Sequence, residues 1–179
     1  MAAKGNINKV LNKYCANFHN YELKFVCRQY CNMILIADEP TTALDVTIQA
    51  QVLELMKELK ETINTAMIMI THDLGIVAEI CDKVAIMYAG SVVEMANKYE
   101  LFTSPKHPYT IGLFNSIPDI DKDEDSLKPI KGLMPDPMNL PSGCPFHPRC
   151  DNVMPRCSQE VPKRTDLGGG HSVSCLLFE

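Results

Sequence analysis

A run of four apolar residues that ends in two adjacent carboxylates limits most strongly how this chain can fold. Residues 34–37 (ILIA) lead directly into Asp38 and Glu39, and Pro40, which cannot continue a central strand, follows them. This pattern predicts a buried parallel strand. Ligand sites in open α/β sheets lie beyond the carboxyl ends of the strands, so both acids are placed where a metal ion and an attacking water could be held. A strand followed by a merely acidic turn is the alternative for these residues alone.

A helix and a second strand complete a parallel unit. Apolar residues at helical spacing predict a helix over Val46–Ile63, with Asp45 as its N-cap. The short apolar run Ala66–Ile70 predicts a second buried strand, which ends in Thr71-His72-Asp73. Strand, helix and strand in this order form a right-handed crossover, so both polar ends meet at one sheet edge. We therefore predict a shared polar site in which His72 is a candidate contact to a transferring phosphate.

Shorter elements are expected beyond this unit. The patterns predict a helix over 74–81, strands over Lys83–Tyr88 and 91–95 around the turn Ala89-Gly90, and helices over 97–102 and 109–116. The hairpin is expected to change the sheet from parallel to antiparallel. His107 lies between two prolines and is interpreted as a surface turn residue.

Four motifs, in order, resemble a known family. ILIADEPTTALD (34–45) resembles the Walker B and D-loop segment of ATP-binding-cassette ATPases, and Thr71-His72-Asp73 resembles their switch-histidine segment. SPKHPYTIGLFNSIP (104–118) and LPSGCPFHPRC (140–150) resemble the C-terminal extension of the oligopeptide/dipeptide importer subfamily. The resemblance covers the chain from about residue 33 to its end. It implies an α/β fold: a partial P-loop-NTPase-type parallel sheet with helices, followed by a small irregular cysteine-containing extension.

The resemblance also implies a function and a set of roles. Asp38 would hold Mg²⁺ through water, Glu39 would polarise the attacking water, and His72 would contact the γ-phosphate of ATP. Asp45, with Ala43 and Leu44, would face a second ATPase subunit. The implied function is that of the ATP-binding and ATP-hydrolysing subunit of a peptide importer. Its partners would be that second ATPase subunit, two transmembrane permease subunits and a peptide, with nickel as an alternative solute.

Two motifs of the family are missing from the sequence. It contains no G-x-x-x-x-G-K-[ST], hence no phosphate loop, and no LSGGQ-type signature. We therefore expect a truncated subunit that is not active alone. The absent strand of the phosphate loop should leave a sheet edge open, which predicts self-association. The alternatives are a non-catalytic metal-binding or iron–sulfur-binding assembly module and an inactive gene fragment.

The carboxyl-terminal segment carries four of the eight cysteines among several prolines. Cys144, Cys150, Cys157 and Cys175 have the spacing C-x5-C-x6-C-x17-C. A segment with so little core needs a cross-link, and four thiolates suit an iron–sulfur cluster or zinc, with disulfides as the third alternative. The resemblance implies a 4Fe-4S cluster in some family members. His147 and His171 are interpreted as spare ligands.

Charge and hydropathy set further limits. A formal net charge of −5 argues against a nucleic-acid partner, and no apolar run approaches the ~18 residues of a membrane span. The residues 1–32 lack the apolar core of a secretory signal, so a cytoplasmic location, peripheral on the inner face of the cell membrane, is expected. The expected organisation is a leader over 1–32, part of a nucleotide-binding domain over 33–118, a linker over 119–135 and the extension over 136–179. In the leader we expect a weak helix followed by irregular chain, and we interpret Cys15, Cys27 and Cys31 as incidental thiols.

Overall fold

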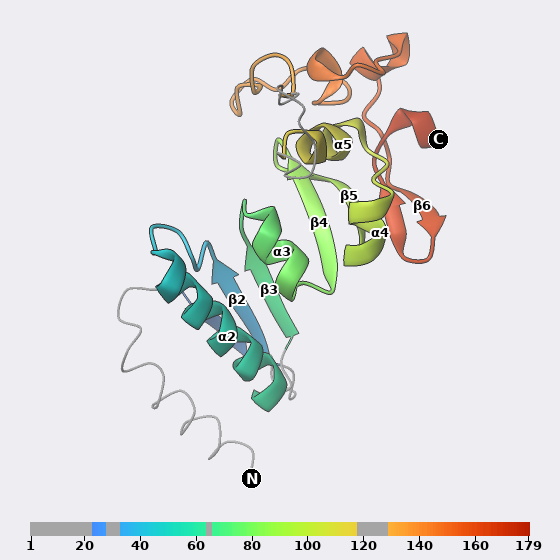
Figure 1. Cartoon of the computed structure of the whole chain (residues 1–179). Helices are drawn as coiled ribbons and strands as arrows, with labels where there is room; N and C mark the ends of the chain where they lie inside the picture. The colour runs from blue at the N-terminus through green and yellow to red at the C-terminus, as the bar shows by residue number, and fades with distance from the viewer. Residues whose placement is uncertain (1–22, 28–32, 64–65, 118–128) are drawn as a thin grey trace. The chain divides into compact units, whose positions relative to one another are not determined.

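The computed structural model describes residues 23–27, 33–63, 66–117 and 129–179 (Figure 1). They belong to two compact units, which divide between Cys81 and Asp82. Helices and strands alternate along the chain, and parallel and antiparallel strand pairs both occur. The chain is therefore an α/β protein, as its sequence predicted. The expected helix near the amino terminus and the thiols Cys15 and Cys31 lie outside the described residues.

The first unit contains a three-stranded sheet in the order β1-β2-β3. Its strands are β1 (Leu23–Cys27), β2 (Met33–Asp38) and β3 (Ala66–Ile70). β2 and β3 are parallel, as predicted, whereas β1 pairs antiparallel with β2. The strand β1 lies where the sequence predicted irregular chain.

Two helices cover one face of this sheet. The helix α2 (Val46–Ile63) begins after Asp45, whose Oδ1 accepts a hydrogen bond from the backbone N–H of Ile48 at 2.9 Å. This contact confirms the predicted N-cap. Val52 and Met56 of α2 pack on Ala37, and Leu53 packs with residues of α3 (Leu74–Ile80). The apolar stripe seen in the sequence is therefore the core of the unit.

The second unit contains a separate antiparallel sheet in the order β4-β5-β7-β6. Its strands are β4 (Lys83–Tyr88), β5 (Ser91–Asn97), β6 (Thr165–Gly168) and β7 (His171–Val173). The predicted hairpin β4-β5 is confirmed, and its turn has positive φ at Ala89 (47°) and Gly90 (79°), as a type I′ turn requires. The expectation that this hairpin extends the parallel sheet is wrong, because its other neighbour is β7 from the carboxyl-terminal segment.

The rest of the second unit packs around aromatic side chains. It contains α4 (Lys98–Thr103), α5 (Pro108–Asn115) and three short 3₁₀ turns, at His147–Arg149, Pro155–Ser158 and Leu176–Phe178. The rings of Tyr88, Tyr109 and Phe146 lie 4.7–5.5 Å apart between centroids, in tilted and edge-on arrangements. The cysteine-containing segment is thus joined to the hairpin by a shared core. No helix in the described ranges is long and apolar enough to cross a membrane.

Candidate functional site

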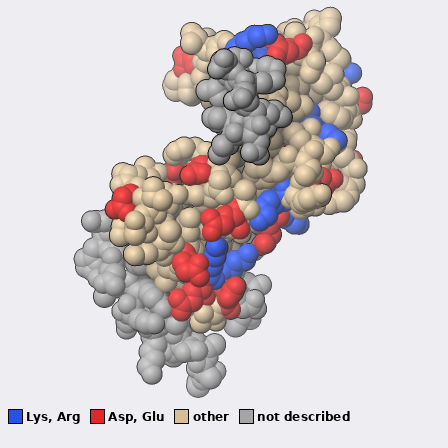
Figure 2. Space-filling view, in the orientation of Figure 1, with Lys and Arg blue, Asp and Glu red and all other residues tan. Residues whose placement is uncertain are grey.

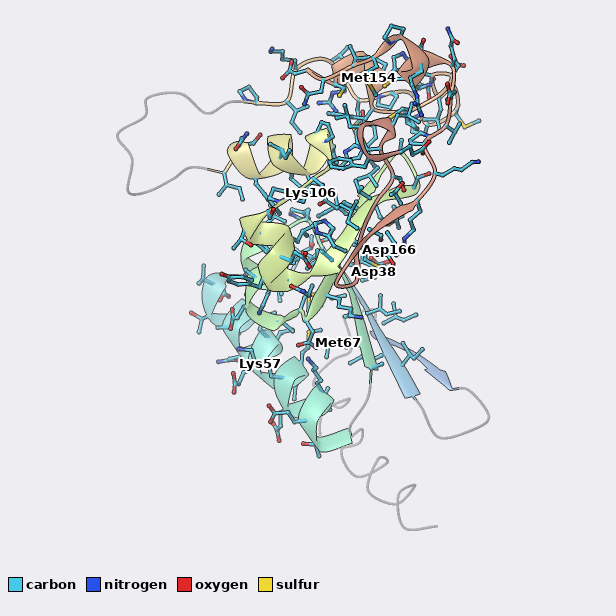
Figure 3. All side chains as sticks on the ribbon, turned by 90° about the vertical axis from the view of Figure 1, so that its right-hand side faces the viewer. Asp38, Lys57, Met67, Lys106, Met154 and Asp166 are labelled. Carbon is cyan, nitrogen blue, oxygen red and sulfur yellow. The ribbon has the colours of Figure 1, made fainter. Side chains whose placement is uncertain are left out.

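The candidate site lies where β2 and β3 end together. Asp38, labelled in Figure 3, is the last residue of β2 and is opposite Ile70, the last residue of β3. The backbone N–H of Glu39 donates a hydrogen bond to the carbonyl oxygen of Ile70 at 2.8 Å. The segment after β2 is therefore fixed against the segment that begins with Thr71.

Glu39 and His72 are in direct contact. Glu39 Oε1 lies 3.0 Å from His72 Nδ1, and Glu39 Oε2 accepts a hydrogen bond from the Thr42 hydroxyl at 2.8 Å. Both carboxylate oxygens are thus held by neighbours. The structure brings the two sequence-predicted residues into one site, together with Asp38 at the adjacent position.

The backbone of this turn is unusual. Glu39 has φ of 45° and Ala43 has φ of 62°, in the left-handed region that residues with a side chain rarely adopt. Such a conformation costs on the order of 1–3 kcal/mol and is found preferentially at functional sites. It turns the chain sharply after β2 and leaves the Glu39 side chain at the sheet edge, within reach of His72.

The contact changes the acidity of both groups. The hydrogen bond from His72 is the largest cause that lowers the pKa of Glu39, and the same bond raises the pKa of His72. The charged pair is therefore complete only between these two shifted pKa values. It is lost when acid protonates Glu39 or when base deprotonates His72. Because both groups are solvent-exposed, the pair contributes little to folding stability. With Nδ1 facing Glu39, Nε2 is the ring nitrogen left to meet a ligand.

Neighbouring polar residues hold the His72 segment in place. Asp73 Oδ1 accepts hydrogen bonds from the backbone N–H groups of Gly75 (2.8 Å) and Ile76 (3.2 Å), which makes Asp73 the N-cap of α3. The Thr71 hydroxyl accepts a hydrogen bond from the Asp73 N–H at 3.1 Å. Asp73 thus has a positioning role, and in this structure Asp45 likewise serves as a cap.

The four carboxyl-terminal cysteines line one cavity, together with His107, Phe146, His147 and Leu176. Gly143 permits this convergence, because a Cβ at its position would lie 2.4 Å from the Cys157 carbonyl oxygen. The Cys144 N–H donates a hydrogen bond to that same oxygen at 2.8 Å. The spacing of the cysteines predicted a common site, and the structure brings all four side chains to it.

These cysteines are free thiols. Burial raises the pKa of Cys144 and Cys150, and raises the pKa of Cys175 to about 11, so each stays protonated unless a cation is nearby. Within the described ranges, no three metal-binding side chains are placed to hold a single ion.

The structure places the three histidines of the second unit in different environments, and two of these environments differ from the predicted ones. His107 is buried, not a surface residue, and burial lowers its pKa to about 4. Its Nδ1 accepts the Tyr109 N–H at 3.0 Å, which caps α5. His171 does not line the cysteine cavity and is held by carboxylates. His147 lines it, with Nδ1 2.9 Å from the Cys144 carbonyl oxygen.

A buried polar cluster around Glu94 was not predicted. Glu94 and His171 expose only 1% of their surfaces, and His171 Nε2 lies 2.7 Å from Glu94 Oε1. The Glu94 carboxylate also accepts the backbone N–H groups of Lys106 (2.7 Å) and His107 (2.9 Å). Glu100 approaches the other ring nitrogen of His171 at 3.4 Å. The cluster joins β5, the turn before α5 and β7.

The visible surface mixes charges of both signs. In Figure 2, Lys and Arg side chains are scattered among Asp and Glu, and no wide basic face is seen from this side. On α2, for example, Lys57 lies 2.6 Å from Glu79 of α3. The charged groups seen from this side thus include pairs of opposite sign.

Comparison with known proteins gives one matching family model and many similar proteins. Residues 93–157 match the family model described as "Oligopeptide/dipeptide transporter, C-terminal region". The chain is 55% identical over 150 residues to the oligopeptide transport ATP-binding protein AppD of Bacillus subtilis, which covers 83% of this chain and 46% of the relative. It is 51% identical over 144 residues to the dipeptide transport ATP-binding protein DppD of the same organism, covering 80% and 43%.

A third relative gives the same result. The oligopeptide transport ATP-binding protein OppD of Haemophilus influenzae is 52% identical over 144 residues, which is 80% of this chain and 44% of that protein. The chain thus spans about half the length of the curated relatives it matches. These similarities do not support the alternative function of a non-catalytic metal-binding or iron–sulfur-binding assembly module. The matches show that the chain is a partial counterpart of the ATP-binding subunits of oligopeptide and dipeptide ATP-binding-cassette importers, as its motifs predicted.

Proposed function

We propose that this chain supplies the water-activating and magnesium-binding part of an ATPase that drives peptide import. The observation that carries the proposal is the contact between Glu39 and His72 at the shared end of two parallel strands. A carboxylate and an imidazole at such an edge can orient a water and meet a phosphate. The similarity to three peptide-transport ATP-binding proteins supports ATP as the ligand.

Each residue has a separate task in this proposal. Asp38, next to Glu39, binds Mg²⁺ through water, and Mg²⁺ offsets the charge of the β- and γ-phosphates. Glu39 orients the attacking water, and His72, through Nε2, contacts the γ-phosphate. Thr42 holds the second oxygen of Glu39, so the carboxylate keeps a fixed direction. Asp45, in the same loop, faces a second ATPase subunit.

The partners of the complete machine follow from the same proposal. ATP would be bound between two ATPase subunits that act on two transmembrane permease subunits, with an oligopeptide or dipeptide as the solute. This chain would then be located at the inner face of the cell membrane as a peripheral subunit. A pull-down of this chain with detergent-solubilised permease subunits tests the assignment, and failure to bind them would contradict it.

The chain alone is expected to bind Mg-ATP only weakly. Its sequence has no glycine-rich phosphate loop, so the backbone N–H groups and the lysine that hold the β- and γ-phosphates are missing. Isothermal titration calorimetry should give a dissociation constant no tighter than about 1 mM, equivalent to about 4 kcal/mol of binding free energy. Low-micromolar binding would show that another part of the chain replaces the phosphate loop.

We further propose that the cysteine cavity holds a 4Fe-4S cluster. The four thiol groups line one cavity, and in a cluster each iron can be bound by a different thiolate. Cys144, Cys150, Cys157 and Cys175 would each bind one iron. The cluster would supply cross-links to a segment with little core of its own, and zinc is the rival occupant.

Removing one ligand should empty this site. In Cys150→Ser protein prepared without oxygen, iron and sulfide per chain should fall at least fivefold, because a hydroxyl is a poor replacement for a soft thiolate. Metal analysis, sulfide assay and visible absorbance measure the loss. Cys81→Ser is the matched control, because Cys81 lies outside the cavity lining. Parent protein with zinc but no iron would contradict the cluster, and parent protein with neither would contradict any metal centre.

A further inference from the structure

Two histidine rings, those of His107 and His147, line the cavity that the four carboxyl-terminal cysteines share. In His107, Nδ1 accepts the backbone N–H of Tyr109 at 3.0 Å, so the ring carries its proton on Nε2. In His147, Nδ1 lies 2.9 Å from the carbonyl oxygen of Cys144, which can only accept, so the proton is on Nδ1. The two rings therefore have opposite tautomers in their neutral forms. Only His107 has a hydrogen-bond donor at Nε2.

This donor has no partner within the part of the chain that the structure describes. The side chain of His107 makes one hydrogen bond there, the one at Nδ1. The polar side-chain atoms that are fully enclosed without a partner in the described ranges are Thr110 Oγ1 and Arg156 Nε, and His107 Nε2 is not among them. Nε2 therefore meets open space, although His107 exposes only 1% of its surface, and the space that His107 lines is the cysteine cavity. Because a buried donor without an acceptor is costly, an acceptor in this cavity would stabilise the fold.

The buried carboxylate of Glu94 holds His107 in place. Glu94 Oε2 accepts the backbone N–H of His107 at 2.9 Å, and Glu94 Oε1 accepts that of Lys106 at 2.7 Å. The ring of His107 also packs on Phe146, with the two centroids 5.7 Å apart. The direction of the Nε2–H group is thus set before anything occupies the cavity, which lowers the entropy lost when it binds. This gives the Glu94 cluster a task that the proposed function leaves open.

We propose that His107 Nε2–H donates a hydrogen bond to a sulfur atom of the 4Fe-4S cluster and raises the reduction potential of that cluster. The inference rests on the proposed cluster and adds a residue that does not bind iron. Thiolate and sulfide sulfurs carry negative charge, and hydrogen bonds to them are among the factors that set the potential. Reduction adds one negative charge to the cluster, so the donor stabilises the reduced form more than the oxidised form.

Two substitutions separate the roles of the two ring nitrogens. In His107→Asn, the amide oxygen is as many bonds from the backbone as Nδ1, so it can still accept the Tyr109 N–H, but no donor reaches the position of Nε2. In His107→Gln, the amide nitrogen is as many bonds from the backbone as Nε2 and can still donate into the cavity, but the cap of α5 is lost. Asn97→Ser is the matched control, because Asn97 caps α4 with its side chain and does not line the cavity.

The measurement is a reductive titration of the full chain. Each protein is purified without oxygen, its iron is determined, and the cluster is titrated with dithionite while visible absorbance and electron paramagnetic resonance are recorded. At a fixed potential, the ratio of reduced to oxidised cluster should fall about tenfold in His107→Asn, which is a potential about 59 mV lower for a one-electron couple. The ratio in His107→Gln and in Asn97→Ser should remain that of the parent. Iron content should be the same in all four proteins.

The outcomes separate the donor role from the cluster itself. Parent protein without iron contradicts the proposed cluster and overturns the donor role with it. With iron present, an unchanged ratio in His107→Asn overturns the donor role alone. An equal fall in the Asn and Gln variants also overturns it, since packing would then be the cause, and so does loss of iron from His107→Asn, since His107 would then be a ligand.

A measurement on the parent protein needs no variant to fold. In protein labelled with ¹⁵N-histidine, the reduced cluster should show magnetic coupling to an exchangeable proton on a histidine nitrogen, because the donated proton lies between that nitrogen and a cluster sulfur. Absence of this coupling overturns the donor role.

Discussion

Glu39→Gln is expected to lower ATP turnover by about 10²–10⁴-fold, because a correctly positioned general base contributes a rate factor of this size. The variant is made in a chimera in which this chain replaces the matched stretch of the Bacillus subtilis AppD protein. The amide has the same shape as the carboxylate and can still accept the Thr42 hydroxyl. It cannot take a proton from water, nor form the ion pair with His72. Nucleotide binding and nucleotide-driven dimerisation should therefore remain while hydrolysis is lost.

Steady-state phosphate release and dimer formation with ATP are the two measurements. Glu61→Gln is the charge-matched control, because Glu61 is an exposed residue of α2 and should leave turnover unchanged. His72→Ala in the same chimera should lower the rate with a smaller loss of binding, since His72 contacts Glu39 and, in the proposed function, also contacts the γ-phosphate. Undiminished hydrolysis in Glu39→Gln would show that another group activates the water.

The first unit was predictable from sequence because its signals are local. Strand, helix and strand follow from the apolar run ILIA, the apolar stripe of Val46–Ile63 and the apolar run AMIMI. The right-handed crossover between the two parallel strands then brings the polar residues that follow them to the same sheet edge. The contact of Glu39 and His72 spans 33 residues but follows from that single rule. The strand β1 was missed, since its five residues make a short segment whose strand signal is weak without its partner.

The buried cluster of the second unit could not be predicted in this way. His171 and Glu94 are 77 residues apart, and they meet because β7 pairs with β5 across a long connection. In the sequence, His171 follows three glycines and looks like a loop residue, and Glu94 interrupts an apolar strand. Charged residues at such positions are normally solvated. The sequence gives only one weak indication of the cluster, which is the acidic residue Glu94 within the apolar run VVEMA (92–96).

Removing the Glu94 carboxylate should destabilise the second unit by about 3–5 kcal/mol, the usual cost of leaving a buried partner uncompensated. In Glu94→Ala, three donors lose their acceptor: His171 Nε2 and the backbone N–H groups of Lys106 and His107. Water cannot take the place of the lost carboxylate without opening the site, because Glu94, His171 and His107 are each only 1% exposed. The loss should thus exceed that of a typical surface ion pair several-fold.

Hydrogen exchange measured by mass spectrometry on peptides of β5 and β7 reports the loss of stability in the second unit alone. An unfolding curve of the whole chain would combine the transitions of both units. Protection of those amides should fall by about 10²–10⁴-fold in Glu94→Ala, because each 1.4 kcal/mol lost corresponds to about a tenfold change. Glu100→Ala is the matched control, because Glu100 is part-exposed and meets His171 only at 3.4 Å, so its loss should stay within about tenfold. Equal effects of the two variants would mean that packing around β7, rather than the Glu94 carboxylate, holds the carboxyl-terminal strands to the hairpin.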